Sequence, residues 1–67
     1  MKKPTFRAAF LPDGSTALKC KQTGTKYLVA HAGHDYAAYR EGTLIRTGDR
    51  ATVVDAVESD AKWALRS

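Results

Sequence analysis

The sequence contains a single cysteine, two prolines and no long hydrophobic run. Because Cys20 has no second cysteine to pair with, an internal disulfide is excluded and a reducing compartment is indicated. No segment stays apolar over the roughly 18 residues that a membrane span requires, so we expect no membrane partner. Met1 to Pro4 are not followed by the apolar region of a secretory signal. Together these absences lead us to expect a cytoplasmic protein.

The chain also lacks the motifs that carry most enzyme chemistry. It has no glycine-rich phosphate loop, no nucleophile elbow and no paired carboxylates in a cleft-forming context. Cys20, His31, His34 and Asp35 include the ligand types that hold zinc, but Cys20 is isolated in sequence and is predicted to point into the core. A nucleophilic dyad of Cys20 and His31 would lack an oxyanion hole. We therefore expect no catalytic residue, no metal site and no cofactor.

The small size allows one domain with one thin core. A chain of 67 residues buries only about 60% of the surface that it exposes when unfolded. We expect the single domain, 1–67, to consist of a mobile basic arm at 1–4, a sheet over 5–46 and a helix over 49–65. No repeat, low-complexity tract or linker divides it.

Two short apolar runs joined by Pro12-Asp13-Gly14 predict an N-terminal β-hairpin. Pro12 favours the second position of a type I turn, Asp13 the third, and Gly14 accepts the positive φ that closes a three-residue loop. The loop predicts a register that pairs Phe6 with Cys20, Arg7 with Lys19, Ala8 with Leu18 and Phe10 with Thr16. The apolar side chains then share one face of the sheet, whereas Arg7 and Lys19 lie on the other.

A second turn around Thr23-Gly24 predicts a third antiparallel strand, Lys26 to His31. A two-residue loop would pair Cys20 with Tyr27 and Leu18 with Val29. This pairing keeps the same two faces, one apolar and one basic. The apolar face comprises Phe6, Ala8, Phe10, Leu18, Cys20, Tyr27, Val29 and, at its end, His31, and the other face carries Arg7, Lys19, Lys21, Lys26 and Leu28.

The remaining chain predicts two more strands and a helix. Glu41-Gly42, between strands at 36–40 and 43–46, suits either a two-residue or a three-residue loop, so the faces of the fifth strand stay unassigned. Asp49 or Thr52 can begin the helix. Its predicted apolar stripe comprises Val53, Val54, Val57, Ala61, Ala64 and Leu65. The pattern indicates an α+β fold: an antiparallel sheet of four to five short strands, hairpin first, with one C-terminal amphipathic helix packed on one face.

Positive charge is concentrated in the predicted sheet. Residues 1–46 contain eight Lys/Arg and three Asp/Glu, a net charge of +5, whereas residues 47–67 contain three and four, a net charge of −1. An anionic partner would therefore meet the sheet rather than the helix. Trp63 falls about 140° from the centre of the apolar stripe, so we expect it to be exposed and able to anchor a partner. The alternative is that the final turn of the helix frays or that a loop folds over the ring. The candidate binding residues are Lys2, Lys3, Arg7, Lys19, Lys21, Lys26 and Trp63.

From Lys26 to Leu65, the order of three strands and a helix is similar in architecture to the arm-binding domain of phage integrases and to AP2-type domains. The resemblance implies a sheet that enters the major groove of DNA. Arg40 and Arg46 would then be the available base-reading side chains on the last two strands. The sequence departs from this pattern in its additional N-terminal hairpin.

Two functions of a non-catalytic binding module follow from these observations. Compact basic domains without catalytic motifs are the kind of protein that phages and mobile elements encode to disable host machines, anti-CRISPR proteins among them. We therefore expect an inhibitor that covers a surface of a nucleic-acid-handling complex. The alternative is a module that binds DNA directly through the basic sheet face. Pairing through the first or fifth strand would make the protein a homodimer instead of a monomer.

Overall fold

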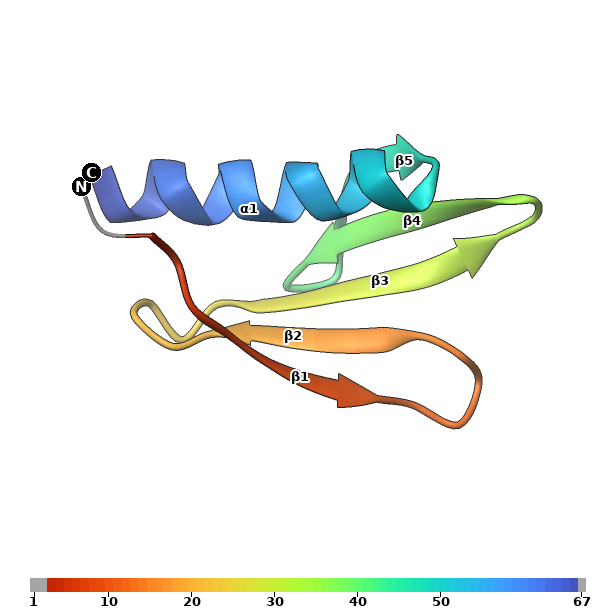
Figure 1. The fold of residues 1–67 in the computed structure, drawn as a ribbon, viewed down its shortest axis with the longest axis horizontal. Coiled ribbons are helices and arrows are strands. Elements are labelled where there is room, and N and C mark those ends of the chain that lie inside the picture. The colour runs from red at the N-terminus through yellow and green to blue at the C-terminus, as the bar shows by residue number, and fades with distance from the viewer. Residues whose placement is uncertain (1–2, 67) are drawn as a thin grey trace.

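The computed structural model describes residues 3–66, which form five strands and one helix (Figure 1). The elements are β1 (Phe6–Phe10), β2 (Thr16–Cys20), β3 (Lys26–Ala32), β4 (Asp35–Arg40), β5 (Thr43–Gly48) and α1 (Arg50–Arg66). The strands form one antiparallel sheet in the order β1-β2-β3-β4-β5, and α1 packs against it. The predicted α+β fold with a C-terminal helix is confirmed.

The first hairpin has the register that its turn predicts. Phe6 pairs with Cys20, Arg7 with Lys19, Ala8 with Leu18 and Phe10 with Thr16. Gly14 has a φ of 91°, a left-handed value that glycine adopts without strain. The Gly14 N–H donates to the Leu11 carbonyl, and the Leu11 N–H donates to the Ser15 carbonyl. This three-residue loop fixes which side chains of β1 and β2 face α1.

The pairing of β2 with β3 differs from the predicted register by two residues. Leu18, not Cys20, lies opposite Tyr27. The predicted two-residue loop is wrong because the Cys20 N–H donates to the Thr25 carbonyl, which leaves residues 21–24 in the turn. A shift by two residues keeps every side chain on its predicted face, so the division into an apolar and a basic face is unchanged.

Glu41 and Gly42 form a two-residue loop between β4 and β5. Their φ values are 50° and 85°, and positive φ at both central residues is the signature of a type I′ turn. Arg40 pairs with Thr43 across this turn. The structure thus selects the shorter of the two loops that the sequence allowed.

A β-bulge follows this turn and assigns the faces of β5. Tyr39 pairs with Leu44, whereas Ala38 pairs with Arg46, so Ile45 is the extra residue. Ala38 is fully buried in the core beneath α1, which places its partner Arg46 on the same side. Ile45 also packs against the core, and Leu44 lies on the opposite face beside Tyr39.

The start of α1 is fixed by Asp49, one of the two predicted caps. Its Oδ1 accepts a hydrogen bond from the Thr52 N–H at 2.8 Å. Hydrogen bonds from the Thr52 side chain and backbone lower the pKa of Asp49. At the other end Ala64 is exposed, so its predicted place in the buried stripe is wrong. The last turn of α1 extends past the ends of the strands, where no sheet covers it (Figure 1).

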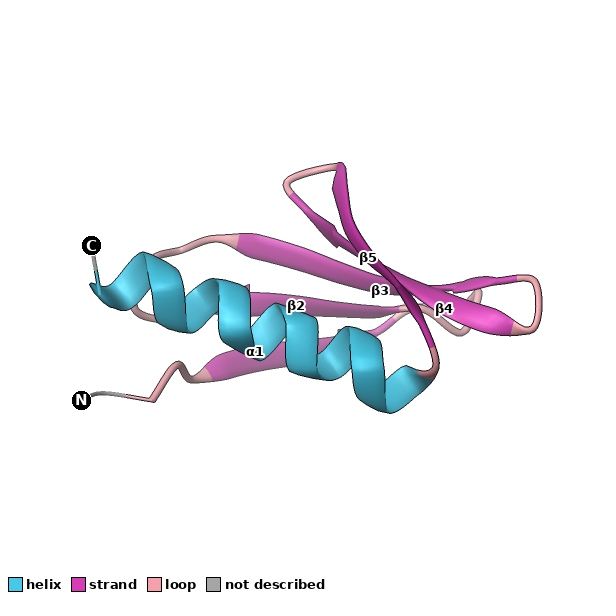
Figure 2. Cartoon of the chain, turned by 90° about the horizontal axis from the view of Figure 1, so that it is seen from above, coloured by secondary structure: helices cyan, strands magenta, loops and turns pink. Residues whose placement is uncertain are grey.

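The core lies between α1 and one face of the sheet. Its buried residues are Cys20, Tyr27, Val29, Ala38, Val53, Val57 and Ala61. The helix packs mainly against β3, β4 and β5. Strand β1 lies farthest from it (Figure 1), and Figure 2 shows α1 running over one face of the sheet. In the described chain, no second helix covers the opposite face of the sheet, which is termed the open face.

Candidate binding surface

The open face carries a row of three cations. Arg7 pairs with Lys19, and Lys19 pairs with Lys26, so the three side chains lie side by side on β1, β2 and β3. They alternate along these strands with Leu18, Tyr27 and other residues that pack in or against the core. Since neighbouring strands are about 4.8 Å apart, the Cα atoms of the outer two residues, Arg7 and Lys26, are about 10 Å apart. Arg7, Lys19 and Lys26, termed the basic row, can meet one anionic surface together.

The charges of the basic row are not neutralised within the described chain. Among residues 3–66, none of its three side chains has an ion-pair partner. Glu41 lies at the rim, where its Oε1 accepts a hydrogen bond from the Lys26 backbone N–H at 2.8 Å. Like charges directly opposite each other destabilise a sheet by about 0.2–1 kcal/mol per pair. Folding alone therefore does not favour this arrangement.

An apolar row runs beside the basic row and crosses all five strands. It consists of Ala9, Ala17, Leu28, Tyr39 and Leu44, each paired with the next. Leu44 is 52% exposed, and Leu28 and Tyr39 are half-buried. Two shallow hollows of about 380 and 290 Å³ are lined largely by residues of the two rows. The open face thus presents apolar surface directly beside positive charge.

The other candidate lysines are Lys2, Lys3 and Lys21. They lie near the open face or outside the described residues. The Lys21 N–H donates to the Thr5 carbonyl at 2.8 Å, which continues the pairing of β1 with β2 and places the Lys21 side chain on the open face. Lys3 is exposed, and its carbonyl accepts a hydrogen bond from Gln22 Nε2 at 2.8 Å. Lys2 lies outside the described residues, and the mobility of the arm at 1–4 stays a prediction.

Trp63 is exposed as predicted, but it belongs to a different surface. Its side chain is 69% exposed on α1 and has the Arg66 guanidinium carbon 5.6 Å from its ring centroid. With Ile45, Arg46 and Asp55 it lines a groove of about 530 Å³ between β5 and α1. The structure therefore does not bring Trp63 together with the basic row.

Arg40 and Arg46 also lie on the side of the sheet that faces α1. Arg40 forms an ion pair with Asp60 on the helix. Arg46 lines the groove beside Trp63. The two arginines that the integrase-type resemblance assigns to base reading therefore point away from the open face.

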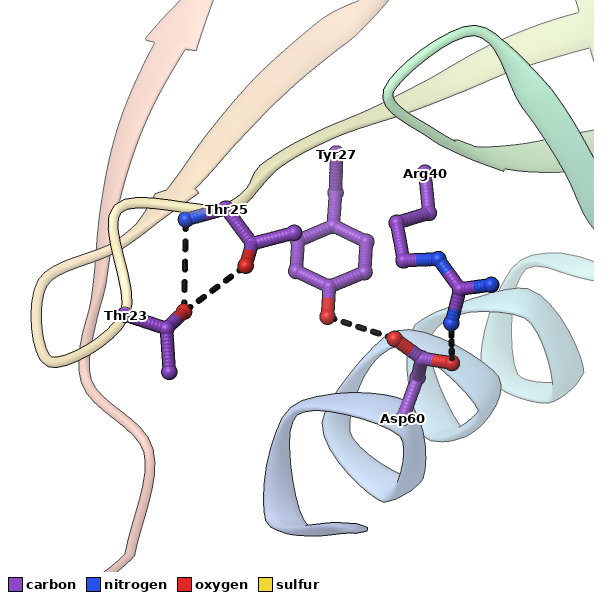
Figure 3. Close-up of polar contacts among 5 residues, drawn as sticks. All are labelled: Thr23, Thr25, Tyr27, Arg40 and Asp60. Atoms are coloured by element: carbon purple, nitrogen blue, oxygen red, sulfur yellow. Dashed lines mark hydrogen bonds and ion pairs between the residues drawn. The ribbon is translucent and has the colours of Figure 1, made fainter. Parts of the chain in front are cut away.

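A polar network joins β3 and β4 to the helix on the side of the sheet opposite the open face (Figure 3). The Tyr27 hydroxyl donates to Asp60 Oδ2 at 2.7 Å, and the Arg40 guanidinium donates to Oδ1. Burial, reinforced by the Asp60 carboxylate, raises the pKa of Tyr27. This network could not be predicted from a local pattern, because Asp60 lies 33 and 20 residues from its partners in the chain. It fixes α1 against β3, the strand that carries Lys26 and Leu28.

The residues considered for zinc binding or nucleophilic chemistry make other contacts. Within residues 3–66, no group of three or more His, Cys, Asp or Glu residues could hold a metal ion. Cys20 is fully buried, with its Sγ 3.5 Å from Gln22 Oε1. The His31 ring packs against Tyr36 at 4.6 Å between centroids. Cys20 thus serves as a core residue, and His31 supports the aromatic packing at the end of β3.

No helix of the described residues is long and apolar enough to cross a membrane. We also compared the chain with models of known protein families, with curated proteins and with solved structures, and found no match. Function is therefore inferred from the surfaces of the molecule.

Proposed function

We propose that this chain is a non-catalytic binding protein that uses its open face to cover an acidic surface on a protein partner. The observation that carries the proposal is the basic row lying directly beside the apolar row. Protein interfaces combine apolar contact with charges that complement those of the partner. The open face offers both over three neighbouring strands, and its charges oppose one another until a partner neutralises them.

The composition of the apolar row favours a protein over DNA. Base edges and phosphates are recognised mainly through hydrogen-bond donors and acceptors. On β3, β4 and β5 the row instead presents Leu28, Tyr39 and Leu44. The arginines of the last two strands face α1 and offer the open face no donor. A partner with apolar side chains beside carboxylates matches this surface better than a duplex does.

The role that fits such a surface is inhibition by occlusion, and the expected target is a complex that handles nucleic acid. Nucleases and polymerases gather carboxylates around their metal ions, so they carry acidic surfaces that a basic row complements. Compact basic domains without catalytic motifs are the kind of inhibitor that phages and mobile elements encode, so an origin of this kind is part of the proposal. A cytoplasmic setting is part of the proposal, since Cys20 is a free thiol.

The first test separates a protein partner from DNA. A labelled peptide of alternating glutamate and leucine serves as the probe of an acidic, apolar surface, and a labelled mixed-sequence duplex as the probe of DNA. Both are titrated at about 50 and 200 mM salt, a range over which several phosphate contacts cost orders of magnitude in affinity. The wild type is compared with the double variant Lys19→Glu/Lys21→Glu. The matched control, Arg50→Glu/Lys62→Glu, makes the same change of charge on α1.

We expect the peptide to bind the wild type and the control but not the Lys19/Lys21 variant, with NMR shift changes confined to the open face. Leu44→Ser should weaken peptide binding without unfolding the protein, because Leu44 is half exposed. Duplex binding that weakens steeply with salt and disappears in the Lys19/Lys21 variant would overturn the proposal in favour of a DNA-binding module.

A further inference from the structure

Strand β1 forms an edge of the sheet and has a free backbone edge. The Thr5 carbonyl and the Leu11 N–H bond to residues that pair with them across the first hairpin. Since backbone groups alternate in direction along an antiparallel strand, those of Phe6, Ala8 and Phe10 point away from β2. Within residues 3–66 no strand pairs with them. β1 therefore presents an unused row of donors and acceptors.

This edge lacks the features that usually prevent pairing between molecules. Edge strands are commonly blunted by lysine, proline, a bulge or a covering element. The opposite edge strand, β5, has a bulge at Ile45 and lies beside α1. β1 has neither, and Arg7 is its only charge. Phe10, at its end, is 79% exposed and so is available for an apolar contact with another chain.

We propose that two copies of the chain pair antiparallel along β1 and form one continuous sheet across a twofold axis at Ala8. In this register Ala8 faces Ala8 of the second copy, and Phe6 faces Phe10 at both ends. These are the residues whose backbone groups point outward, so each facing pair exchanges two hydrogen bonds. The partner of this surface is therefore a second copy of the chain itself.

The side chains select the same register. On the side that faces α1, Phe10 would lie against Phe6 of the second copy, a ring that already packs edge-on against Tyr27 at 6.0 Å between centroids. On the open face, Arg7 would lie opposite Ala9 of the second copy. A twofold axis at Arg7 would place the two guanidinium groups directly opposite each other, and an axis at Ala9 would leave Phe6 without a partner.

The dimer would also join the two open faces into one. The two Arg7 side chains become diagonal neighbours, about 7–8 Å apart, so the two basic rows meet at the axis. Their repulsion is screened by salt, and we expect dimerisation to strengthen as salt rises. This behaviour is opposite to that of a dimer held by salt bridges.

A cysteine scan tests the axis directly. Single variants Arg7→Cys, Ala8→Cys and Ala9→Cys are exposed to a mild oxidant and followed on a non-reducing gel. Ala64→Cys, at an exposed alanine of α1, is the control. Only a residue on the axis faces its own copy, at a Cα separation of about 5.5 Å that a disulfide can bridge. We expect Ala8→Cys to cross-link fastest. Faster cross-linking at Arg7 or Ala9, or rates equal to the control at all three positions, would overturn the proposal.

Sedimentation equilibrium tests the dimer without a disulfide. The wild type should dimerise, more tightly at about 0.3 than at 0.05 M salt. Ala8→Lys should be monomeric, because it places two like charges at the axis, whereas Ala64→Lys should behave as the wild type. If Ala8→Lys proves unfolded by circular dichroism, Phe10→Lys replaces it. A monomeric wild type at millimolar concentration would refute the dimer and leave the binding experiments on the open face unaffected.

Discussion

Lys19 stands at the centre of the basic row, where it faces Arg7 on one side and Lys26 on the other. The substitution Lys19→Glu would convert two like-charge pairs into two opposite-charge pairs. We therefore predict that this variant is more stable than the wild type, although it removes a group on which binding is proposed to depend.

The size of the effect follows from the cross-strand geometry. Each directly opposed pair contributes about 0.2–1 kcal/mol, with a sign set by its charges. The substitution removes two repulsive pairs and creates two attractive pairs. The side chains are exposed and screened, so the low end of this range applies to each of these four pair energies. The expected gain is about 1 kcal/mol in the free energy of unfolding. For a domain of 67 residues this corresponds to an increase in Tm of about 4–8 °C.

Thermal unfolding at two salt concentrations provides the assay, with Lys62→Glu as the control. Lys62 lies four residues after Glu58 on α1, so its reversal makes the same change in net charge but creates a like-charge pair. We expect the control to be slightly less stable than the wild type. Salt should stabilise the wild type, by screening the basic row, and destabilise Lys19→Glu. An unchanged or lower Tm for Lys19→Glu, or the same salt trend in both proteins, would refute the assigned register of like charges.

Three further predictions concern the helix and its contacts. Tyr27→Phe removes the hydrogen bond to Asp60 and should lower the free energy of unfolding in urea by about 1–2 kcal/mol. Because burial raises the pKa of Tyr27, the wild type should also lose stability as the pH rises above about 10, and the variant should lose less. Asp49→Ala should lower Tm at neutral pH, whereas Asp49→Asn should retain the cap but lose part of the acid sensitivity. The hydrogen bonds from Thr52 lower the pKa of Asp49, so the stability that its carboxylate contributes is present above about pH 4 and is lost as the pH falls further. If the wild type and Asp49→Asn lost stability in acid to the same extent, this prediction would be contradicted. Trp63→Ala should change the free energy of unfolding by less than about 1 kcal/mol and leave peptide binding to the open face intact, since the ring is 69% exposed on another surface.

The parts of the fold that depend on local chemistry could be predicted from the sequence. Pro12, Asp13 and Gly14 specify a loop of one length, and that length fixed the first register. The helix was predicted from apolar residues at helical spacing and from two candidate caps, Asp49 and Thr52, of which Asp49 is the cap in the structure. In both cases the determining residues are neighbours in sequence, so no knowledge of distant contacts was needed.

The parts that depend on distant contacts could not be predicted. The turn at 21–24 is longer than the Thr23-Gly24 pair alone suggests, and it is closed by backbone bonds across the hairpin. The bulge at Ile45 follows from packing that extra residue against the core, which no pattern within β5 specifies. The bulge also decides the face of Leu44, so the sequence alone could not show that the apolar row extends to β5. The basic face was predicted correctly despite the wrong register, since a shift by two residues preserves the face of every side chain. The direct pairing of Lys19 with Lys26, which completes the basic row, follows only from the observed register.

The single helix explains why so much of the sheet stays available. A helix is about 10 Å wide and neighbouring strands are about 4.8 Å apart, so α1 can cover about three of the five strands. It packs mainly on β3, β4 and β5, and the turn end of the first hairpin remains beyond its reach. Phe10 is therefore exposed although it belongs to the face that α1 covers elsewhere, and it borders a groove of about 300 Å³ between this hairpin and the start of α1. A second copy paired along β1 would supply apolar contacts at this uncovered end and leave the open face to a different partner. The single helix thus leaves both proposed surfaces uncovered, the β1 edge and the open face. Variants at Ala8 test the first surface, and variants at Lys19 test the second.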